Sequence, residues 1–201
     1  DIIAQILPEI QPMIGFDQHN AYHKYTVWEH SVRAVEGIRP DPLLRLAALL
    51  HDVGKPDTFS RDERGVGHFY GHPARSRELA EQMVQRLRLP VQMERQLLYL
   101  VRHHDTPLGS KTRHVRRKLA VHGEETFRAL LAIKKADGIG QGTTPQNLTE
   151  LLETERLLEQ VLTEDSCLTR RDLAVNGNDL IAWGARGRAV GYYLSAMLNR
   201  V

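Results

Sequence analysis

The sequence predicts an all-α protein, a helical bundle with one small β-hairpin and a C-terminal helical extension. Apolar residues recur at helical spacing through nearly every segment of the 201 residues. Helix start signals, such as Thr26 with Glu29 three positions later, divide the chain into short segments. One patch over 57–70 is strand-like, with "TFS" and "GHFY" on either side of the turn "RDERG", which favours a hairpin.

The elements are expected in the following order. A short apolar helix over 2–14 is interrupted by Pro8 and Pro12, and a capped helix runs from Thr26 to about Ile38. Pro73 marks the first turn of a helix, which places His72 at its N-cap. The other helices are expected at 42–52, 91–104, 113–121, 124–137 and 147–163, before a tail with a short helix, a glycine turn and a last helix from about Arg188.

The segment "GIGQGTTPQ" is the best candidate boundary in the chain, because its glycines and proline interrupt the helical pattern. We therefore predict two parts. Residues 1–140 form one helical domain, and residues 141–201 form the helical extension.

Composition narrows the classes of function. The 27 basic and 25 acidic residues leave a formal net charge of +2, which makes no general electrostatic case for nucleic acid. The single cysteine, Cys167, excludes an internal disulfide and thiolate metal sites. No apolar stretch approaches the roughly 18 residues of a membrane span, and no signal peptide is visible. We expect a cytoplasmic protein without a membrane partner.

The stretch "LRLAALLHDVGKP" ends an apolar helix in a histidine and an aspartate. Gly54 is expected to stop this helix, so His51 and Asp52 lie in its last turn. Burying both groups costs free energy unless each has a partner. That partner is either a hydrogen bond or ion pair, or a metal ion.

Further histidines and aspartates fall at helix ends or on apolar faces. Such donors, drawn from several helices into a bundle core, suit a divalent transition metal. One site can take His30, His51, Asp52 and Asp137, and a second can take Asp52 as a bridge with His72, His103 and His104.

The order "H…HD…H…HH…D" around "HDVGK" resembles the HD superfamily of metal-dependent phosphohydrolases. The segments "GFDQHNAYHKYTVWEHSVRAV", "LAALLHDVGKP", "GVGHFYGHPARS", "LVRHHDTPL" and "DLAVNGNDLIAWG" are similar to the HD-containing region of bacterial CCA-adding tRNA nucleotidyltransferases. This resemblance covers essentially the whole chain. It implies one or two divalent ions on the donors named above, with Asp52 as the bridge. Manganese, nickel, iron, magnesium, cobalt and zinc all remain open as the metal.

The chain also departs from that family. It has neither the Gly-rich motif nor the Asp-x-Asp of the nucleotidyltransferase head. We therefore expect that it cannot add nucleotides alone. It is either a standalone relative or, since it starts at Asp1, a piece of a longer enzyme.

The resemblance implies hydrolysis of phosphodiesters or phosphomonoesters on nucleotides or RNA ends, such as 2′,3′-cyclic phosphates, with tRNA among the candidate partners. The predicted catalytic residues are Asp52 and Lys55. Lys55 can neutralise a phosphate oxygen, or it can be a solvated lysine after a helix. The alternative function is a non-catalytic, helical tRNA-binding or scaffold portion of a tRNA nucleotidyltransferase-like enzyme. Nothing in the sequence indicates the oligomeric state.

Two other features have competing interpretations. Basic residues gather around the helix at 113–121 and can contact an RNA backbone or form a solvated face; they include Lys111, Arg113, Arg116 and Arg117. His68, in the hairpin, is expected to be a surface or packing residue.

Overall fold

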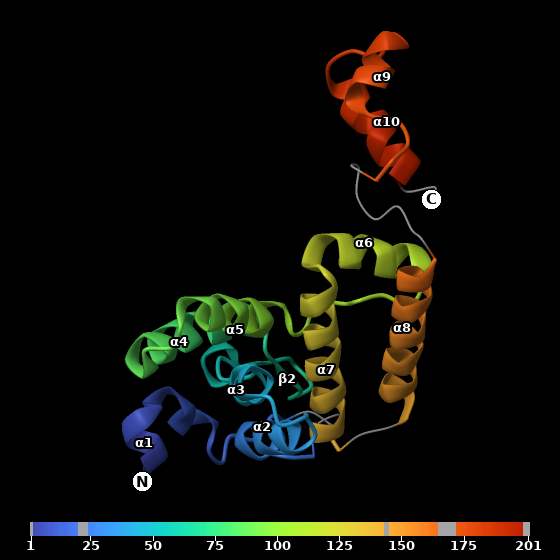
Figure 1. Cartoon of the computed structure of the whole chain (residues 1–201). Helices are drawn as coiled ribbons and strands as arrows, with labels where there is room; N and C mark the ends of the chain where they lie inside the picture. Colours follow the sequence, from blue (N-terminus) through green and yellow to red (C-terminus); the bar gives the residue numbers. More distant parts are fainter. Residues whose placement is uncertain (1, 20–23, 143–144, 165–171, 199–201) are drawn as a thin grey trace. The chain divides into compact units, whose positions relative to one another are not determined.

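The computed structural model describes residues 2–19, 24–142, 145–164 and 172–198. Its described part is helical apart from one two-stranded antiparallel hairpin, which confirms the predicted fold class (Figure 1). Among the described helices, none combines the length and apolar character that crossing a membrane requires. Cys167 lies outside the described residues.

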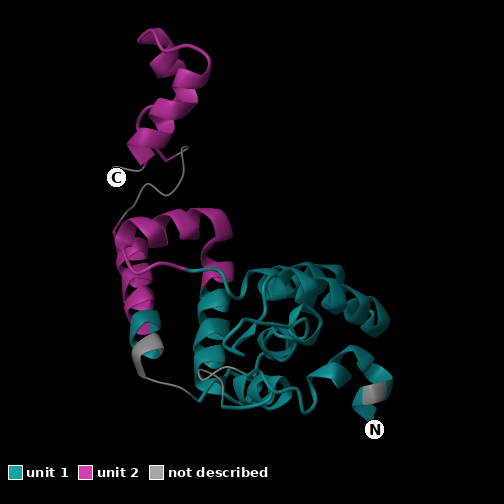
Figure 2. Ribbon diagram, turned by 180° about the vertical axis from the view of Figure 1, so that it is seen from behind, with its two compact units in different colours: residues 1–107, 128–151 teal, residues 108–127, 152–201 magenta. Residues whose placement is uncertain are grey.

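The chain divides into two compact units (Figure 2). Unit 1 comprises residues 1–107 and 128–151, and unit 2 comprises residues 108–127 and 152–201. Unit 1 is therefore built from two separate stretches of sequence. The predicted division after residue 140 stays a prediction.

Unit 1 contains the hairpin and most of the helices. Its N-terminal segment forms two short helices, because the prolines remove backbone donors that one continuous helix would need. The elements are α1 (Ile2–Ile6), the 3₁₀ helix η1 (Pro8–Met13), α2 (Val27–Glu36), α3 (Pro42–Leu50), the 3₁₀ helix η2 (Pro56–Thr58), β1 (Ser60–Arg61), β2 (Gly67–His68), α4 (His72–Leu87), α5 (Val91–His103) and α7 (Glu124–Gly140), whose first four residues belong to unit 2.

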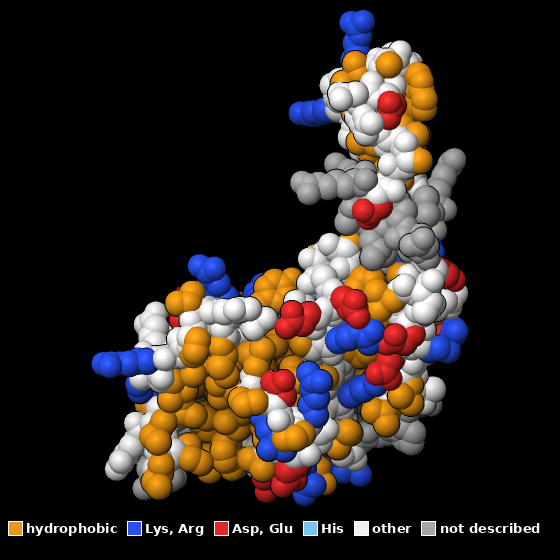
Figure 3. Space-filling view, viewed as in Figure 1, with side chains coloured by type: hydrophobic (Ala, Val, Ile, Leu, Met, Phe, Trp, Pro, Cys, Tyr) orange, Lys and Arg blue, Asp and Glu red, His pale blue; other side chains and the backbone are white. Residues whose placement is uncertain are grey.

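Helix α3 lies at the centre of unit 1, where it packs against α2 and α5, and α5 in turn packs against α4. Its helical spacing puts Leu44, Ala47 and Ala48 on one buried face. The apolar side chains of α4 and α5 complete this core. Figure 3 shows hydrophobic side chains also gathered on the surface over the part of unit 1 that holds α1, α3 and α4.

The turn after α3 carries the histidine–aspartate pair. The helix ends at Leu50 with His51 as its C-cap, slightly earlier than expected. Gly54 does not adopt the left-handed backbone of a helix-ending glycine. Its N–H instead donates a hydrogen bond to Ser76 Oγ of α4, at 2.9 Å. Gly54 thus allows a close approach between the turn and α4.

The hairpin leads directly into α4. Strands β1 and β2 pair with Ser60 opposite His68 and Arg61 opposite Gly67. Gly71 is the N-cap of α4, in a left-handed conformation with φ +79°, so His72 becomes the first helical residue rather than the expected N-cap. The one-residue difference follows from the glycine, which takes positive φ at little cost.

A capping box starts α2, as predicted. Thr26 Oγ1 accepts a hydrogen bond from the Glu29 N–H, and the Glu29 carboxylate accepts one from the Thr26 N–H. This cap fixes the start of the helix that carries His30.

Replacing Thr26 with alanine is expected to lower the free energy of unfolding by about 1 kcal/mol, because the first turn loses a side-chain acceptor for a backbone N–H. Urea unfolding followed by circular dichroism measures the change. Thr26→Ser keeps the hydroxyl and should retain most of the stability. Equal losses in both variants would contradict the capping interpretation.

Unit 2 holds α6 (Thr112–His122), the first turn of α7, most of α8 (Pro145–Thr163), α9 (Gly177–Ala182) and α10 (Arg188–Leu198). Two contacts join α8 to the segment that precedes α7. Arg116 forms an ion pair with Glu164 at 2.8 Å, and Thr154 Oγ1 donates to the Gly109 carbonyl oxygen at 2.9 Å.

Candidate metal centre

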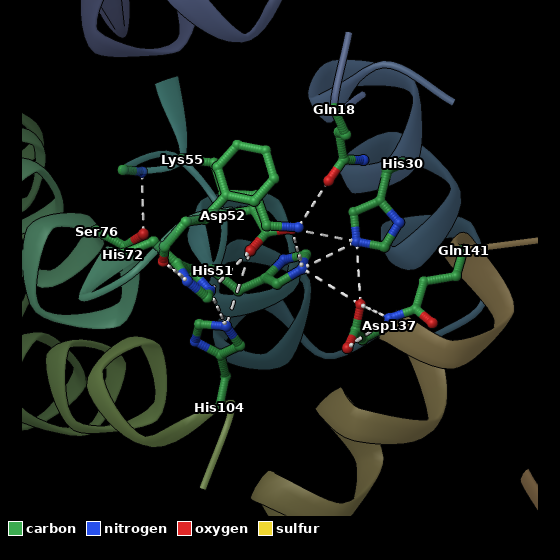
Figure 4. Close-up of polar contacts among 12 residues, drawn as sticks. Gln18, His30, His51, Asp52, Lys55, His72, Ser76, His104, Asp137 and Gln141 are labelled. Carbon is green, nitrogen blue, oxygen red and sulfur yellow. Dashed lines mark hydrogen bonds and ion pairs between the residues drawn. The ribbon is translucent and has the colours of Figure 1, made fainter. Parts of the chain in front are cut away.

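Every predicted donor except His103 reaches one place in unit 1 (Figure 4). Four of these side chains are almost fully buried: His30, His51, Asp52 and His104. The six donors come from separate elements. Helix α2 supplies His30, the turn after α3 supplies His51 and Asp52, α4 supplies His72, the C-cap of α5 supplies His104, and α7 supplies Asp137. The bundle thus collects residues that are far apart in the sequence.

The Asp52 carboxylate lies between two histidine pairs. Its Oδ2 is 3.3 Å from His30 Nε2 and 3.2 Å from His51 Nε2. Its Oδ1 is 3.3 Å from His72 Nε2 and 3.8 Å from His104 Nε2. We call His30, His51 and Asp52 group 1, and Asp52, His72 and His104 group 2; the donor atoms of each lie close enough together to hold a metal ion.

Asp137 borders group 1. Its Oδ1 lies 3.0 Å from His30 Nε2 and 3.7 Å from His51 Nε2. Gln141, directly after the end of α7 and four residues after Asp137, donates to the Asp137 carboxylate at 3.3 Å. Helix α7 therefore contributes a carboxylate that a neighbouring amide orients toward the histidines.

Backbone carbonyls fix three of the imidazole rings. Nδ1 of each ring donates to the carbonyl of the residue three positions earlier, at 2.7–2.9 Å, in the pairs His51–Ala48, His72–Phe69 and His104–Val101. A carbonyl oxygen can only accept, so each Nδ1 carries a proton. The Nε2 atom of each ring therefore faces the centre, which is the usual arrangement of ligating histidines.

The charges of the centre shift several pKa values. Burial alone would lower the pKa of His51, but the charge of Asp52 and hydrogen bonds to Asp137 and Asp52 outweigh it and raise this pKa to about 10. Burial would raise the pKa of Asp52, but the charges of His51 and Lys55 hold it well below its usual range. Burial and the charge of His51 lower the pKa of His104 to about 3, so this ring is neutral.

These donors fit a divalent metal. In group 2, Nε2 of His72 lies 3.2 Å from Nε2 of His104. When both rings are neutral, two such lone pairs cannot hydrogen-bond to each other, whereas both can bind one cation. Donors about 2 Å from a common ion lie roughly 3 Å apart, which matches this spacing. Imidazole and carboxylate donors leave the identity of the metal open.

Lys55 is buried rather than solvated. Its Nζ lies 2.7 Å from Asp52 Oδ2 and donates to Gln18 Oε1 at 2.8 Å. Gln18 is itself buried, and its amide donates to the Tyr25 carbonyl at 3.1 Å. Sequence reasoning missed Gln18, because a polar residue in an irregular loop has no periodicity that marks it as buried.

A pocket of about 350 Å³ opens beside the centre. It is lined by Asp52, Lys55, His72, His104 and Asp137, by Asp105, Gln141 and Pro73, and by the stretch Gly67–Gly71 of the hairpin. The hairpin wall was not predicted, and His68 lies in it. Alternation along a strand would have placed His68 and Tyr70 on one face, but the sequence does not show which face meets the site.

The remaining predicted residues lie elsewhere. The His103 ring lies 4.4 Å from the Tyr99 ring, and His103 belongs to neither group. At the end of α5, where successive residues point about 100° apart, His104 faces the centre and His103 faces the Tyr99 ring. Lys111, Arg113 and Arg117 are exposed on unit 2, whereas Arg116 pairs with Glu164. Their role in RNA binding stays a prediction.

The fold and the site together define the class of this protein: it is an all-α bundle whose histidines surround a His-Asp pair. The family model of the HD domain matches residues 20–141, and the chain belongs to the HD domain family. Members of this family are generally metal-dependent hydrolases, and the cluster of histidines and aspartates fits that chemistry.

Relatives of this chain include two tRNA nucleotidyltransferases and a multifunctional CCA protein. An A-adding tRNA nucleotidyltransferase of Deinococcus radiodurans is 39% identical over 138 residues, covering 65% of this chain and 31% of the relative. A CC-adding tRNA nucleotidyltransferase of Thermus thermophilus is 30% identical over 206 residues, covering 98% and 46%. A multifunctional CCA protein of Azoarcus sp. is 30% identical over 171 residues, covering 79% and 41%. The chain thus spans less than half the length of these relatives.

Proposed function

We propose that the chain is a metal-dependent phosphohydrolase, acting on phosphodiesters or phosphomonoesters of nucleotides or RNA ends. The observation that carries this proposal is the Asp52 carboxylate, which belongs to both histidine groups and lines the pocket. A purely structural ion pair needs one partner, whereas Asp52 has histidine nitrogens on both of its oxygens. Its position suits a residue that bridges two cations.

His30, His51, Asp52 and Asp137 would hold one ion, and Asp52, His72 and His104 a second. Divalent ions in such sites supply Lewis acidity and lower the pKa of water from ~16 to about 7. The Nδ1 hydrogen bonds of His51, His72 and His104 orient these ligands before any ion binds.

Lys55 would act on the phosphate. Its side chain lines the pocket and is held in place by Asp52 and Gln18. A fixed, buried ammonium stabilises negative charge on a phosphate oxygen more strongly than a solvated lysine does, because little solvent reorganises during the reaction. The proposed role of Lys55 is therefore to neutralise charge that develops in the transition state.

The test combines metal analysis with turnover. The purified chain is expected to contain one or two equivalents of a transition metal by plasma mass spectrometry. It should hydrolyse adenosine 2′,3′-cyclic phosphate, lose this activity after chelation, and regain it with manganese, nickel or cobalt. A chain without bound metal that hydrolyses nothing with any of these ions would overturn the proposal.

The second candidate is a helical, non-catalytic portion of a tRNA nucleotidyltransferase-like enzyme that binds tRNA. The observation in its favour is that similarity to the Thermus thermophilus relative covers 98% of this chain, tail included. Under this alternative, tRNA affinity should be unaffected by chelation and by substitution of Asp52. Filter binding with tRNA measures both effects.

A further inference from the structure

We propose that His68 and Tyr70 form a subsite for a nucleobase at the rim of the pocket. The inference rests on the proposed function and specifies its substrate class: a nucleoside phosphate, with its phosphate at the candidate metal centre and its base on the hairpin. Three separate observations support this subsite.

The first observation is a stacked ring pair. The rings of His68 and Tyr70 are parallel to within 8°, with their centroids 5.4 Å apart. Both residues line the pocket that reaches Asp52. Tyr70 is 78% exposed, so burial in the fold does not explain its position.

The second observation is the anchoring of this pair. His68 Nε2 lies 3.1 Å from Asp62 Oδ2. The other oxygen of Asp62 accepts hydrogen bonds from the N–H groups of Arg64 and Val66, each at 2.9 Å, and so fixes the hairpin turn. The His68 ring is therefore held by the turn itself, and Tyr70 stacks on a ring that is already fixed. A preorganised aromatic surface binds a ligand with a smaller loss of conformational entropy.

The third observation is the distance along the chain to the centre. Tyr70 lies two residues before His72, and the whole stretch 67–73 lines one wall of the pocket. A phosphate beside Asp52 and Lys55 would therefore leave the rest of a nucleotide along this wall. The pocket, at about 350 Å³, falls in the size range of sites for small molecules.

A nucleobase is the ligand group that this surface fits best. Every base has a π-face, so stacking on an aromatic side chain holds a base without selecting a sequence. His68 and Tyr70 offer flat ring faces, and neither has a guanidinium group that would hydrogen-bond to the edge of a particular base. We therefore expect a subsite that accepts both purines and pyrimidines. Purines should bind more tightly, because their rings have a larger area.

The experiment compares two cyclic phosphodiesters in the manganese-loaded protein: adenosine 2′,3′-cyclic phosphate and glycerol 1,2-cyclic phosphate, which has no base. Tyr70→Ala is expected to raise KM for the adenosine compound about tenfold or more and to leave the glycerol compound unchanged. Tyr70→Phe keeps the ring and should restore the KM of the parent protein. Tyr192→Ala, which removes another tyrosine that is 70% exposed, should change neither value.

Saturation-transfer NMR with adenosine monophosphate, in the presence of EDTA, separates the two proposals. We expect saturation to transfer from the parent protein to the adenine protons and not from Tyr70→Ala. That result supports the subsite even if the chain hydrolyses nothing. Equal effects of Tyr70→Ala on the two cyclic phosphates, or unchanged transfer to adenine in that variant, would overturn the subsite while leaving the hydrolase proposal intact.

Discussion

Replacing Asp52 with asparagine is expected to reduce hydrolysis by roughly 10³-fold or more. Losing one hydrogen-bond donor from a preorganised active site costs about 10²–10³ in rate, and Asp52 contributes an oxygen to both groups. Asparagine preserves the shape of the side chain but not its charge, so it cannot balance two cations. Metal analysis should show a parallel loss of bound metal.

The control for Asp52→Asn is Asp57→Asn, which makes the same chemical change in an exposed carboxylate paired with Arg75. This variant should keep its metal and its turnover. Asparagine at position 52 also leaves the buried Lys55 ammonium without its carboxylate, and breaking a buried pair can cost 3–5 kcal/mol. Circular dichroism must therefore show that the variant is folded. A folded Asp52→Asn protein with full metal content and full activity would exclude the proposed centre.

Replacing Gly54 with alanine is expected to lower the free energy of unfolding by about 2–3 kcal/mol and Tm by roughly 5–10 °C. A Cβ atom at this position would lie 2.5 Å from the backbone nitrogen of Ser76 and 2.9 Å from the carbonyl carbon of Arg75. Both are backbone atoms of α4 and cannot rotate away as a side chain could. The turn must therefore separate from α4.

This separation also affects the candidate centre, because Asp52 lies on the turn and His72 starts α4. Gly54→Ala should weaken metal binding as well as stability. Gly138→Ala is the matched control: it adds the same methyl group within α7, where nothing lies within 4 Å, and a helical Gly→Ala change is neutral or stabilising. Thermal unfolding of both variants gives the comparison. Equal Tm values for Gly54→Ala and the parent protein would show that the turn and α4 separate at little cost.

Much of the helical fold could be predicted from the sequence, because helices have strong local signals. The capping box of Thr26 and Glu29 fixed the start of α2, and apolar periodicity marked α3 as a core helix. The N-terminal helix was harder to predict, because proline spacing does not distinguish an interrupted α-helix from a 3₁₀ helix.

The donors of the candidate centre could be predicted where they occupy regular positions on helices. Asp137 follows Leu130 by seven residues and so shares its inward face. The choice between His103 and His104 depends on the rotation of α5 about its axis, which tertiary packing sets. Gln18, His68 and Tyr70 lie in irregular or very short segments, where sequence patterns carry little information about which side chains meet.

The discontinuity of unit 1 has a consequence for the order of folding. The residues of group 1 all lie within 1–107, whereas Asp137 comes only after the chain has passed through residues 108–127 of unit 2. Closing so long a loop costs chain entropy before its contacts stabilise the fold. During synthesis, the histidine cluster therefore emerges from the ribosome well before its last carboxylate. A truncation before α7 would keep the His-Asp pair of α3 and lose the residue that closes the cluster.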